Sequence, residues 1–340
     1  MLHTLDPFAL VIYNDFGIRW YGLAYLTGFF CAYCIILFLS RAKLTYISEN
    51  LISDYVFYVA LGTIIGGRVG YCLFYSPDLL LRLNWKFPFW GLLAVNEGGM
   101  ASHGGIIGII VSSILYAKKH GFPKWHGVDL AALTGPVGVL FGRIANFVNG
   151  ELVGRPSSEN FPLGVKFPQD ILLWPNYEPQ RLTSLGDAVS KIGVSHEQWA
   201  AWVKTYSYDS QAWHKMHDTL NSLIVAVQSN NQAAADALSA VLTLRHPSQI
   251  YAALLEGLFL FLFLASFWKK AYKTPGVITG LFLTMYSVVR IIGEEFRTPD
   301  AQIGFQMFGL TRGQWLSVAM FALGLIFILS LRKQKPNNPA

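Results

Sequence analysis

Two arginines in apolar stretches of the sequence form the patterns with the clearest chemical meaning. Arg143 lies three residues before Asn146. Arg290 lies four residues after Tyr286 and four before Glu294. Residues three or four apart share one face of a helix, so each arginine has polar neighbours on its own face. A guanidinium fork matches the oxygens of a phosphodiester, so the pattern predicts arginines that hold a substrate phosphate and a glutamate that steadies one of them.

Other ionisable or polar side chains fall within apolar stretches, where their cost makes a functional role the default interpretation. His103 is a candidate base, because an imidazole can accept a proton near neutral pH. The opposing interpretations are an ion-pair network that locks helices, for the arginines, and a packing role for His103. Arg68 is ambiguous and is placed behind the site, and Glu256 is predicted to link helices.

The elements that must position these residues are membrane helices. Of the 340 residues, 53% are hydrophobic and only 14% are charged. A bilayer core of ~30 Å needs about 20 apolar residues per helix, and seven stretches approach this length. The fold class predicted is therefore an all-α polytopic membrane protein with seven transmembrane helices. The predicted spans are Trp20–Ser40, Tyr55–Tyr75, Gly98–Ala117, Gly127–Val148, Gln249–Trp268, Thr274–Gly293 and Gly313–Leu331.

The orientation follows from the basic loops, because short loops rich in Lys and Arg stay in the cytoplasm. Basic residues follow every odd-numbered span. They are Arg41 and Lys43, then Lys118, Lys119 and Lys124, then Lys269, Lys270 and Lys273, and finally Arg332, Lys333 and Lys335. This pattern predicts an outer N-terminus and a cytoplasmic C-terminus. Residues 1–17 lack the layout of a cleavable signal peptide, so the first span is expected to remain.

Three regions are predicted along the chain. Residues 1–150 hold the first four spans and an outer-leaflet site, 151–247 form a small extracytoplasmic head, and 248–340 hold the last three spans and a cytoplasmic tail. The head segment is polar and too long for a simple connection. Its stretches Val194–Tyr206 and Asn231–Leu244 are predicted to be short helices.

The depth of the polar residues indicates the kind of substrate. With a rise of about 1.5 Å per residue, Arg143 and His103 lie about 8 Å, and Arg290 about 5 Å, inside the outer ends of their spans. Tyr21 and Asn146 lie at similar levels. Because these groups gather in the outer half of the membrane, a phospholipid headgroup fits them better than a soluble substrate.

Several classes of function are disfavoured. The net charge of +6 is explained by cytoplasmic loops near anionic lipids, so no nucleic-acid partner is predicted. Cys31, Cys34 and Cys72 fall within spans, where a thiol behaves as a small apolar group. His214 and His217 alone make a weak metal signal. No metal site and no cofactor are predicted.

One run of sequence resembles a known family. Residues 142–154, GRIANFVNGELVG, are similar along their whole length to the signature of prolipoprotein diacylglyceryl transferases. The resemblance covers nearly all of the spans. Further matching runs are Arg19-Trp20-Tyr21-Gly22, Gly98-Gly99-Met100, His103-Gly104-Gly105, Arg245-His246-Pro247-Ser248-Gln249-Ile250-Tyr251, and Tyr286 through Arg297-Thr298-Pro299-Asp300. The segment of residues 178–244 looks longer than is expected for the family. This departure concerns how the precursor docks and does not affect the implied chemistry.

The resemblance implies a seven-helix enzyme of the bacterial inner membrane whose site faces the periplasm. Its substrates would be phosphatidylglycerol, among the membrane lipids, and a prolipoprotein signal peptide with a lipobox cysteine. The catalytic residues implied are His103, Arg143, Arg290 and Tyr21. The substrate-binding residues implied are Arg143, Asn146, Glu151, Gly154, Tyr286, Arg290 and Glu294.

In the expected reaction, the precursor's thiol attacks a glycerol carbon, the arginines stabilise the departing glycerol phosphate, and His103 takes the thiol proton. A thioether forms in this first step of lipoprotein maturation. Tyr21, Asn146 and Tyr286 would orient the headgroup. The alternatives are a membrane lipid transporter, which should show a repeat and polar residues through both leaflets, a membrane scaffold, and another membrane acyltransferase.

Overall fold

The computed structural model describes the chain except residues 14–15, 84, 86–87, 96–97, 299–305 and 332–340. Pro299 and Asp300 of the last matching run, and the predicted cytoplasmic tail from residue 332 on, therefore lie outside the described residues. Internal contacts divide the chain into two compact units. The first unit comprises Met1–Ala24, Phe141–Leu255 and Arg290–Trp315, and the second comprises Tyr25–Leu140, Glu256–Val289 and Leu316–Ala340.

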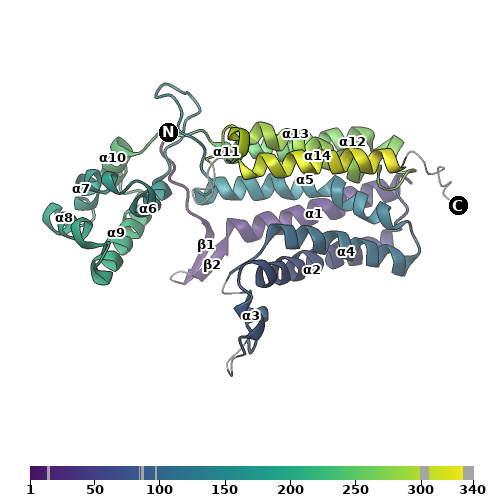
Figure 1. The fold of residues 1–340 in the computed structure, drawn as a ribbon, viewed down its shortest axis with the longest axis horizontal. Helices are drawn as coiled ribbons and strands as arrows, with labels where there is room; N and C mark the ends of the chain where they lie inside the picture. Colours follow the sequence, from purple (N-terminus) through teal and green to yellow (C-terminus); the bar gives the residue numbers. More distant parts are fainter. Residues whose placement is uncertain (14–15, 84, 86–87, 96–97, 299–305, 332–340) are drawn as a thin grey trace. The chain divides into compact units, whose positions relative to one another are not determined.

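Long apolar helices dominate the fold (Figure 1). Their bounds are α1 Trp20–Arg41, α2 Glu49–Phe74, α4 Ser102–His120, α5 Lys124–Asn149, α11 Ser248–Ala252, α12 Leu260–Ala271, α13 Val277–Glu294 and α14 Arg312–Leu331. The π-helical turn η5, Ala253–Phe259, joins α11 and α12 into one segment, Ser248–Ala271. Within η5, Glu256 is fully buried. Among the described residues, six helices are long and apolar enough to cross a membrane.

The six helices correspond to six of the seven predicted spans. The third predicted span, Gly98–Ala117, contains the 19-residue helix α4, which is not among the six. Its ends are polar, with Ser102 and His103 in the first turn and Lys118, Lys119 and His120 in the last. The structure therefore supports a polytopic all-α membrane protein, and α4 as a seventh span stays a prediction.

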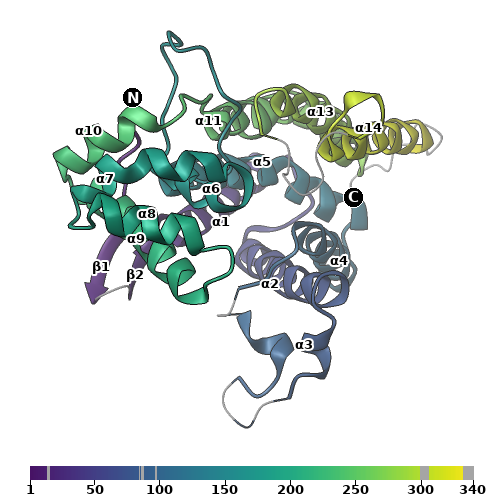
Figure 2. The same cartoon turned by 60° about the vertical axis from the view of Figure 1, so that its left-hand side comes forward.

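In the second unit, α2 and α4 lie side by side along their length (Figures 1 and 2). Glycines every four residues make this possible. A Cβ added at Gly108 would overlap the carbonyl oxygen of Gly62, and one at Gly66 would overlap that of Gly104. Small residues at this spacing let two helix backbones approach closely. Other spans of the unit pack around a core that includes Ile52, Tyr55, Tyr116, Leu130, Leu260, Trp268 and Ile278.

A buried carboxylate fixes the start of one span in the same unit. Asp129 of α5 accepts hydrogen bonds from the backbone N–H groups of Gly276, at 2.6 Å, and Thr279, at 2.8 Å. The hydroxyl of Thr279 donates to it as well, at 2.6 Å. The first N–H groups of a helix have no partner within the helix, so Asp129 satisfies donors at the N-terminus of α13.

In the first unit, short helices form the head (Figure 2). They are η3 Pro168–Leu172, α6 Trp174–Tyr177, η4 Pro179–Leu185, α7 Gly186–Ser190, α8 His196–Thr205, α9 Ser210–Gln228 and α10 Gln232–Val241. They bury a core around Trp174, Trp199, Leu220 and Leu238. Helices α8 and α10 confirm the two predicted head helices. The longest, α9, was not predicted.

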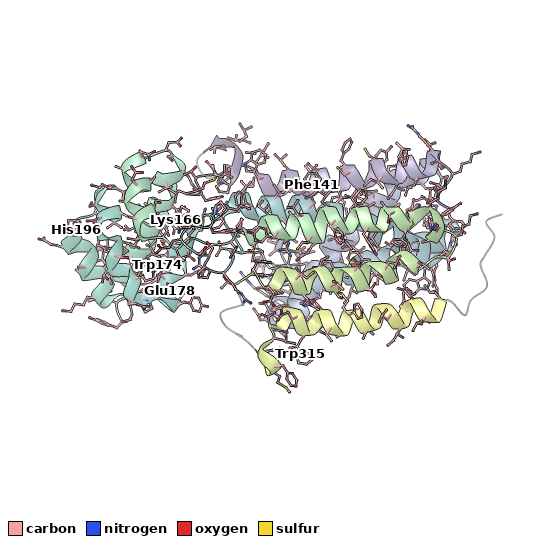
Figure 3. The ribbon with its side chains drawn as sticks, turned by 90° about the horizontal axis from the view of Figure 1, so that it is seen from above. Phe141, Lys166, Trp174, Glu178, His196 and Trp315 are labelled. Atoms are coloured by element: carbon pink, nitrogen blue, oxygen red, sulfur yellow. The ribbon has the colours of Figure 1, made fainter. Side chains whose placement is uncertain are left out.

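Charged and aromatic side chains support this core. Trp174 and Glu178 lie near each other in the head (Figure 3). The guanidinium of Arg181 stacks 3.9 Å from the ring centre of Trp174 and bonds to the carboxylate of Glu178 at 2.6 Å. The indole N–H of Trp199 donates to the carbonyl of Leu182 at 2.7 Å. The head is therefore a packed helical subdomain.

The remaining elements are short. The strands β1, Phe8–Tyr13, and β2, Phe16–Arg19, form an antiparallel hairpin that leads into α1 and that the sequence did not predict. The short helices α3, Asp78–Leu81, and η1, Gly91–Leu93, follow α2, and η6, Met307–Gly309, precedes α14. The N-terminal residues pair with the head, where the backbone N–H of His3 donates to the carbonyl of Lys166 at 2.9 Å.

Candidate active site

Three of the predicted site residues meet in the first unit. The hydroxyl of Tyr21, in the first turn of α1, donates to Oε2 of Glu151 at 3.2 Å. The same hydroxyl accepts a hydrogen bond from the side-chain amide of Asn146, which is buried in the last turn of α5. The amide of Asn149 donates to Oε1 of Glu151 at 3.2 Å. A phenol is thus held between an amide donor and an exposed carboxylate.

The end of α5 turns the chain so that Glu151 reaches this cluster. Gly150 has a φ of +68°, a left-handed conformation that commonly ends helices. The backbone N–H of Glu151 then donates to the carbonyl of Asn146 at 3.0 Å. Leu152 also has a positive φ, of +54°, which is unfavourable for a branched side chain. The surroundings must therefore hold this loop in place.

The second arginine pattern is also found as predicted. Arg290 and Glu294, four residues apart on α13, form an ion pair in which their side chains are 15% and 5% exposed. Thr311 donates its hydroxyl to Glu294 at 2.9 Å, and Arg297 lies 3.8 Å from the same carboxylate. These contacts fix the carboxylate of Glu294, which in turn orients the guanidinium of Arg290.

Arg143 lies on α5 three residues before Asn146 and is half-buried. Arg143 therefore lies on the same face of α5 as Asn146, whose amide donates to the hydroxyl of Tyr21. Together with Arg290, it gives the first unit two partly buried guanidinium groups that are suited to oxyanion binding.

Gly154 has a packing role that the sequence did not reveal. A Cβ at this position would overlap the carbonyl oxygen of His246 and press on that of Phe296. Gly154 also forms an isolated bridge with Arg297. A glycine is therefore required where three chain segments converge, whatever contact it makes with a substrate.

His103 and Tyr286 belong to the second unit. His103 lies in the first turn of α4, is exposed, and has ring contacts with Phe74 and Tyr75 at 6.0 and 5.8 Å between centroids. Tyr286 is half-buried on α13 and stacks on Phe282 at 5.4 Å.

Arg68, left ambiguous by the sequence, is only 4% exposed, and its described hydrogen bonds all go to backbone carbonyls. It donates to Leu92 at 2.9 Å, Gly91 at 2.6 Å and Gly99 at 3.1 Å, and also to Gly98. It therefore anchors the loop that leads into α4 and His103. The placement of Arg68 behind the site stays a prediction.

Two arginines that sequence reasoning did not single out brace the site. Arg155 donates to the carbonyls of Arg297 at 2.9 Å and Glu294 at 3.2 Å. Arg245 forms a buried ion pair with Asp170 at 2.9 Å and also donates to the carbonyl of Gly154 at 3.2 Å. Arg245 lies in one of the matching runs and Arg155 directly follows another. Neither lies in an apolar span, so depth in the membrane did not mark them as candidate functional residues.

A metal centre is not evident in the described part of the chain, where no three His, Cys, Asp or Glu side chains gather as ligands would. The arrangement offers instead guanidinium groups for an oxyanion, and a hydrogen-bonded Tyr–Asn–Glu cluster. Such a site can bind a phosphodiester and orient the groups around it.

Comparison with known proteins places this arrangement in a family. The family model described as prolipoprotein diacylglyceryl transferase matches residues 7–330. A phosphatidylglycerol–prolipoprotein diacylglyceryl transferase of Bdellovibrio bacteriovorus is 53% identical over 97% of this chain and 93% of its own length. Proteins of the same name from Nitrobacter hamburgensis and Rhodospirillum rubrum are each 33% identical, over 99% and 98% of this chain and 91% and 94% of their own. The chain therefore belongs to the prolipoprotein diacylglyceryl transferase family.

Proposed function

We propose that this protein transfers the diacylglyceryl group of phosphatidylglycerol to the lipobox cysteine thiol of prolipoproteins, in the first step of bacterial lipoprotein maturation. Family membership over nearly the whole chain carries the proposal. The relatives' name specifies the lipid donor and the protein acceptor. The two partly buried arginines suit the phosphodiester of that donor.

The reaction makes one bond and breaks another. The sulfur of the precursor cysteine attacks the glycerol carbon that carries the phosphate, so a C–S bond forms and the C–O bond to the phosphate breaks. The electron pair of that bond leaves with the oxygen as glycerol phosphate. The thiol proton passes to a base, for which His103 is the first choice because an imidazole can exchange protons near neutral pH.

The residues have separate roles in this scheme. Arg143 and Arg290 hold the phosphate and stabilise the charge that grows on it as it departs. Glu294 orients Arg290. Tyr21, Asn146, Glu151, Gly154 and Tyr286 shape the binding region for the headgroup and the precursor.

The membrane placement belongs to the same proposal. The protein would lie in the inner membrane with seven spans, including α4, an outer N-terminus and a cytoplasmic C-terminus. The site would then open to the periplasmic leaflet, where a precursor cysteine emerges. The basic loops after the odd-numbered spans support this orientation.

Purified protein, phosphatidylglycerol vesicles and a lipobox peptide test the activity directly. The peptide should gain the mass of one diacylglyceryl group, and a Cys→Ser peptide should gain none. A gain of one acyl chain would indicate an acyltransferase, and an unchanged peptide with lipid moved between leaflets would indicate a transporter. Either result would contradict the proposed transfer.

A further inference from the structure

One short segment of the chain binds most of the backbone carbonyls in the loop that carries Glu151. This segment, Arg245–Gln249, precedes and begins α11. Its residues bind four of the five backbone carbonyls of residues 151–155. The donors are the amide of Gln249 to Glu151, the hydroxyl of Ser248 to Leu152, the guanidinium of Arg245 to Gly154, and the backbone N–H of His246 to Arg155.

Two of these contacts come from side chains that have no other described role. The amide nitrogen of Gln249 lies 2.6 Å from the carbonyl oxygen of Glu151, and the hydroxyl of Ser248 lies 3.0 Å from that of Leu152. Gln249 is 2% exposed and Ser248 is 7% exposed. A carbonyl can only accept, so the amide nitrogen of Gln249 must face it.

The two carbonyls belong to a part of the loop that needs external support. Leu152 has a positive φ of +54°, and Gly150, just before Glu151, has one of +68°. Glycine adopts a positive φ at little cost, but a residue such as Leu152 keeps this conformation only where its surroundings fix it. The Glu151 side chain contacts Tyr21 from this loop, so a small movement of the backbone would separate the two side chains.

We propose that Gln249 and Ser248 are positioning residues for the transfer reaction, which fix the backbone at Glu151 and Leu152 and thereby hold the Glu151 carboxylate against the hydroxyl of Tyr21. This proposal rests on the proposed function. Neither residue needs to touch the substrate. Their effect on the reaction passes through Glu151.

The first test removes each donor while keeping the volume similar. Gln249→Met and Ser248→Ala should lower the rate of diacylglyceryl transfer by roughly tenfold to a hundredfold, because small displacements of catalytic groups cost that much. Matched controls are Gln228→Met, whose amide donates to the carbonyl of Leu5 at 3.1 Å, and Ser266→Ala, whose hydroxyl donates to that of Phe263 at 2.6 Å. The controls should keep wild-type rates.

The second test asks whether Gln249 acts through Glu151. In a double-mutant cycle, Gln249→Met should slow the wild type but add almost nothing to Glu151→Gln, because the positioned group is already lost. Unfolding temperatures of the Gln249→Met and Gln228→Met proteins, measured alongside, separate positioning from a loss of folding. Equal slowing in both backgrounds would contradict the proposal, as would wild-type rates for Gln249→Met.

A third variant decides the matter if Glu151→Gln has no measurable rate. Gln249→Glu places a carboxyl where the amide was, and only its protonated form can donate to the carbonyl of Glu151. Its rate relative to wild type should therefore rise as the pH is lowered, whereas that of Gln249→Met should stay flat. A flat ratio for Gln249→Glu would overturn the proposal. Wild-type transfer is measured first, so a failure of the function itself is recognised separately.

Discussion

At the scale of single residues, charge alone does not explain why arginine stands at positions 143 and 290. A lysine would supply the same positive charge as a compact point, whereas a guanidinium offers several donors in one plane. At position 290, some of the guanidinium donors bind the carboxylate of Glu294. The same carboxylate accepts a hydrogen bond from the hydroxyl of Thr311. The residue chemistry therefore favours geometric recognition of a phosphodiester over simple attraction.

Arg143→Lys tests this geometric requirement. Activity should fall by about a hundredfold, as on removal of one donor that stabilises a charged transition state, while membrane insertion and unfolding temperature stay near wild type. Rates of lipobox peptide modification at saturating phosphatidylglycerol provide the measurement. The control is Arg41→Lys, at an exposed arginine that pairs with Glu49 at 3.1 Å. Wild-type activity for both Arg143→Lys and Arg143→Ala would remove Arg143 from the phosphate site.

At the scale of elements, the protein relies on close backbone contacts and on fixed helix ends. Glycines every four residues allow α2 and α4 to pack closely. The carboxylate of Asp129 accepts hydrogen bonds from backbone N–H groups at the start of α13. The loop anchored by Arg68 leads directly into α4, which carries His103. The packing of this pair therefore bears on the position of the proposed base.

Gly108→Ala tests the close approach of α2 and α4. The added methyl group would overlap the carbonyl of Gly62, so we expect a loss of about 1–3 kcal/mol from overpacking. Gly135→Ala is the matched control, because a Cβ there has no neighbour within 4 Å and alanine favours helices. Unfolding midpoints in detergent provide the comparison. A Gly108→Ala protein as stable as Gly135→Ala would mean that the helices do not pack this closely.

The N-terminal segment gives the first unit a dependence on pH. His3 is fully buried between the rings of Phe147 and Phe167, and burial lowers the pKa of its imidazole, although the backbone at Phe147 partly opposes this. The unfolded chain therefore binds the proton more readily than the folded one. Stability from this group is complete above the ordinary pKa of about 6.5 and declines as the pH falls below it.

Unfolding of the head, followed by tryptophan fluorescence at about pH 8 and about pH 5, should therefore show a lower midpoint at the acidic pH. His3→Phe should reduce this difference. His196→Gln is the control and removes an exposed pair with Asp187. Most of the difference between the two midpoints should remain in this variant, because exposed pairs contribute little to stability. If His3→Phe keeps the full difference, another group is responsible.

At the scale of the whole molecule, the sequence predicted six helices of membrane-spanning length, the ion pair of Arg290 with Glu294, and two head helices. Helix α9 was overlooked although its buried residues Ala212, Met216 and Leu220 recur every four positions. The supporting contacts of Arg155 and Arg245 could not be predicted, because they join segments far apart in the chain to backbone carbonyls. Sequence spacing reveals neighbours within a helix and says little about partners across loops.

The orientation of the whole chain is a prediction that reporter fusions can test. Alkaline phosphatase inserted after Gly193, in the turn between α7 and α8, should be active, because the head is expected outside the cytoplasm. The same enzyme fused after Ala340 should be inactive, and a fluorescent protein there should fold. The physical reason is the retention of basic loops in the cytoplasm. An active phosphatase at the C-terminus would overturn the seven-span topology.

The central claim is that the chain transfers a diacylglyceryl group by substitution at carbon, with the arginines stabilising the departing phosphate. Phosphatidylglycerol labelled with heavy oxygen at the bridge between the diacylglyceryl carbon and phosphorus tests it most directly. After reaction with a lipobox peptide, mass spectrometry should find the whole label in the released glycerol phosphate and a peptide that gains an unlabelled diacylglyceryl group. Label retained in the lipidated peptide or in diacylglycerol would show attack at phosphorus and contradict this account.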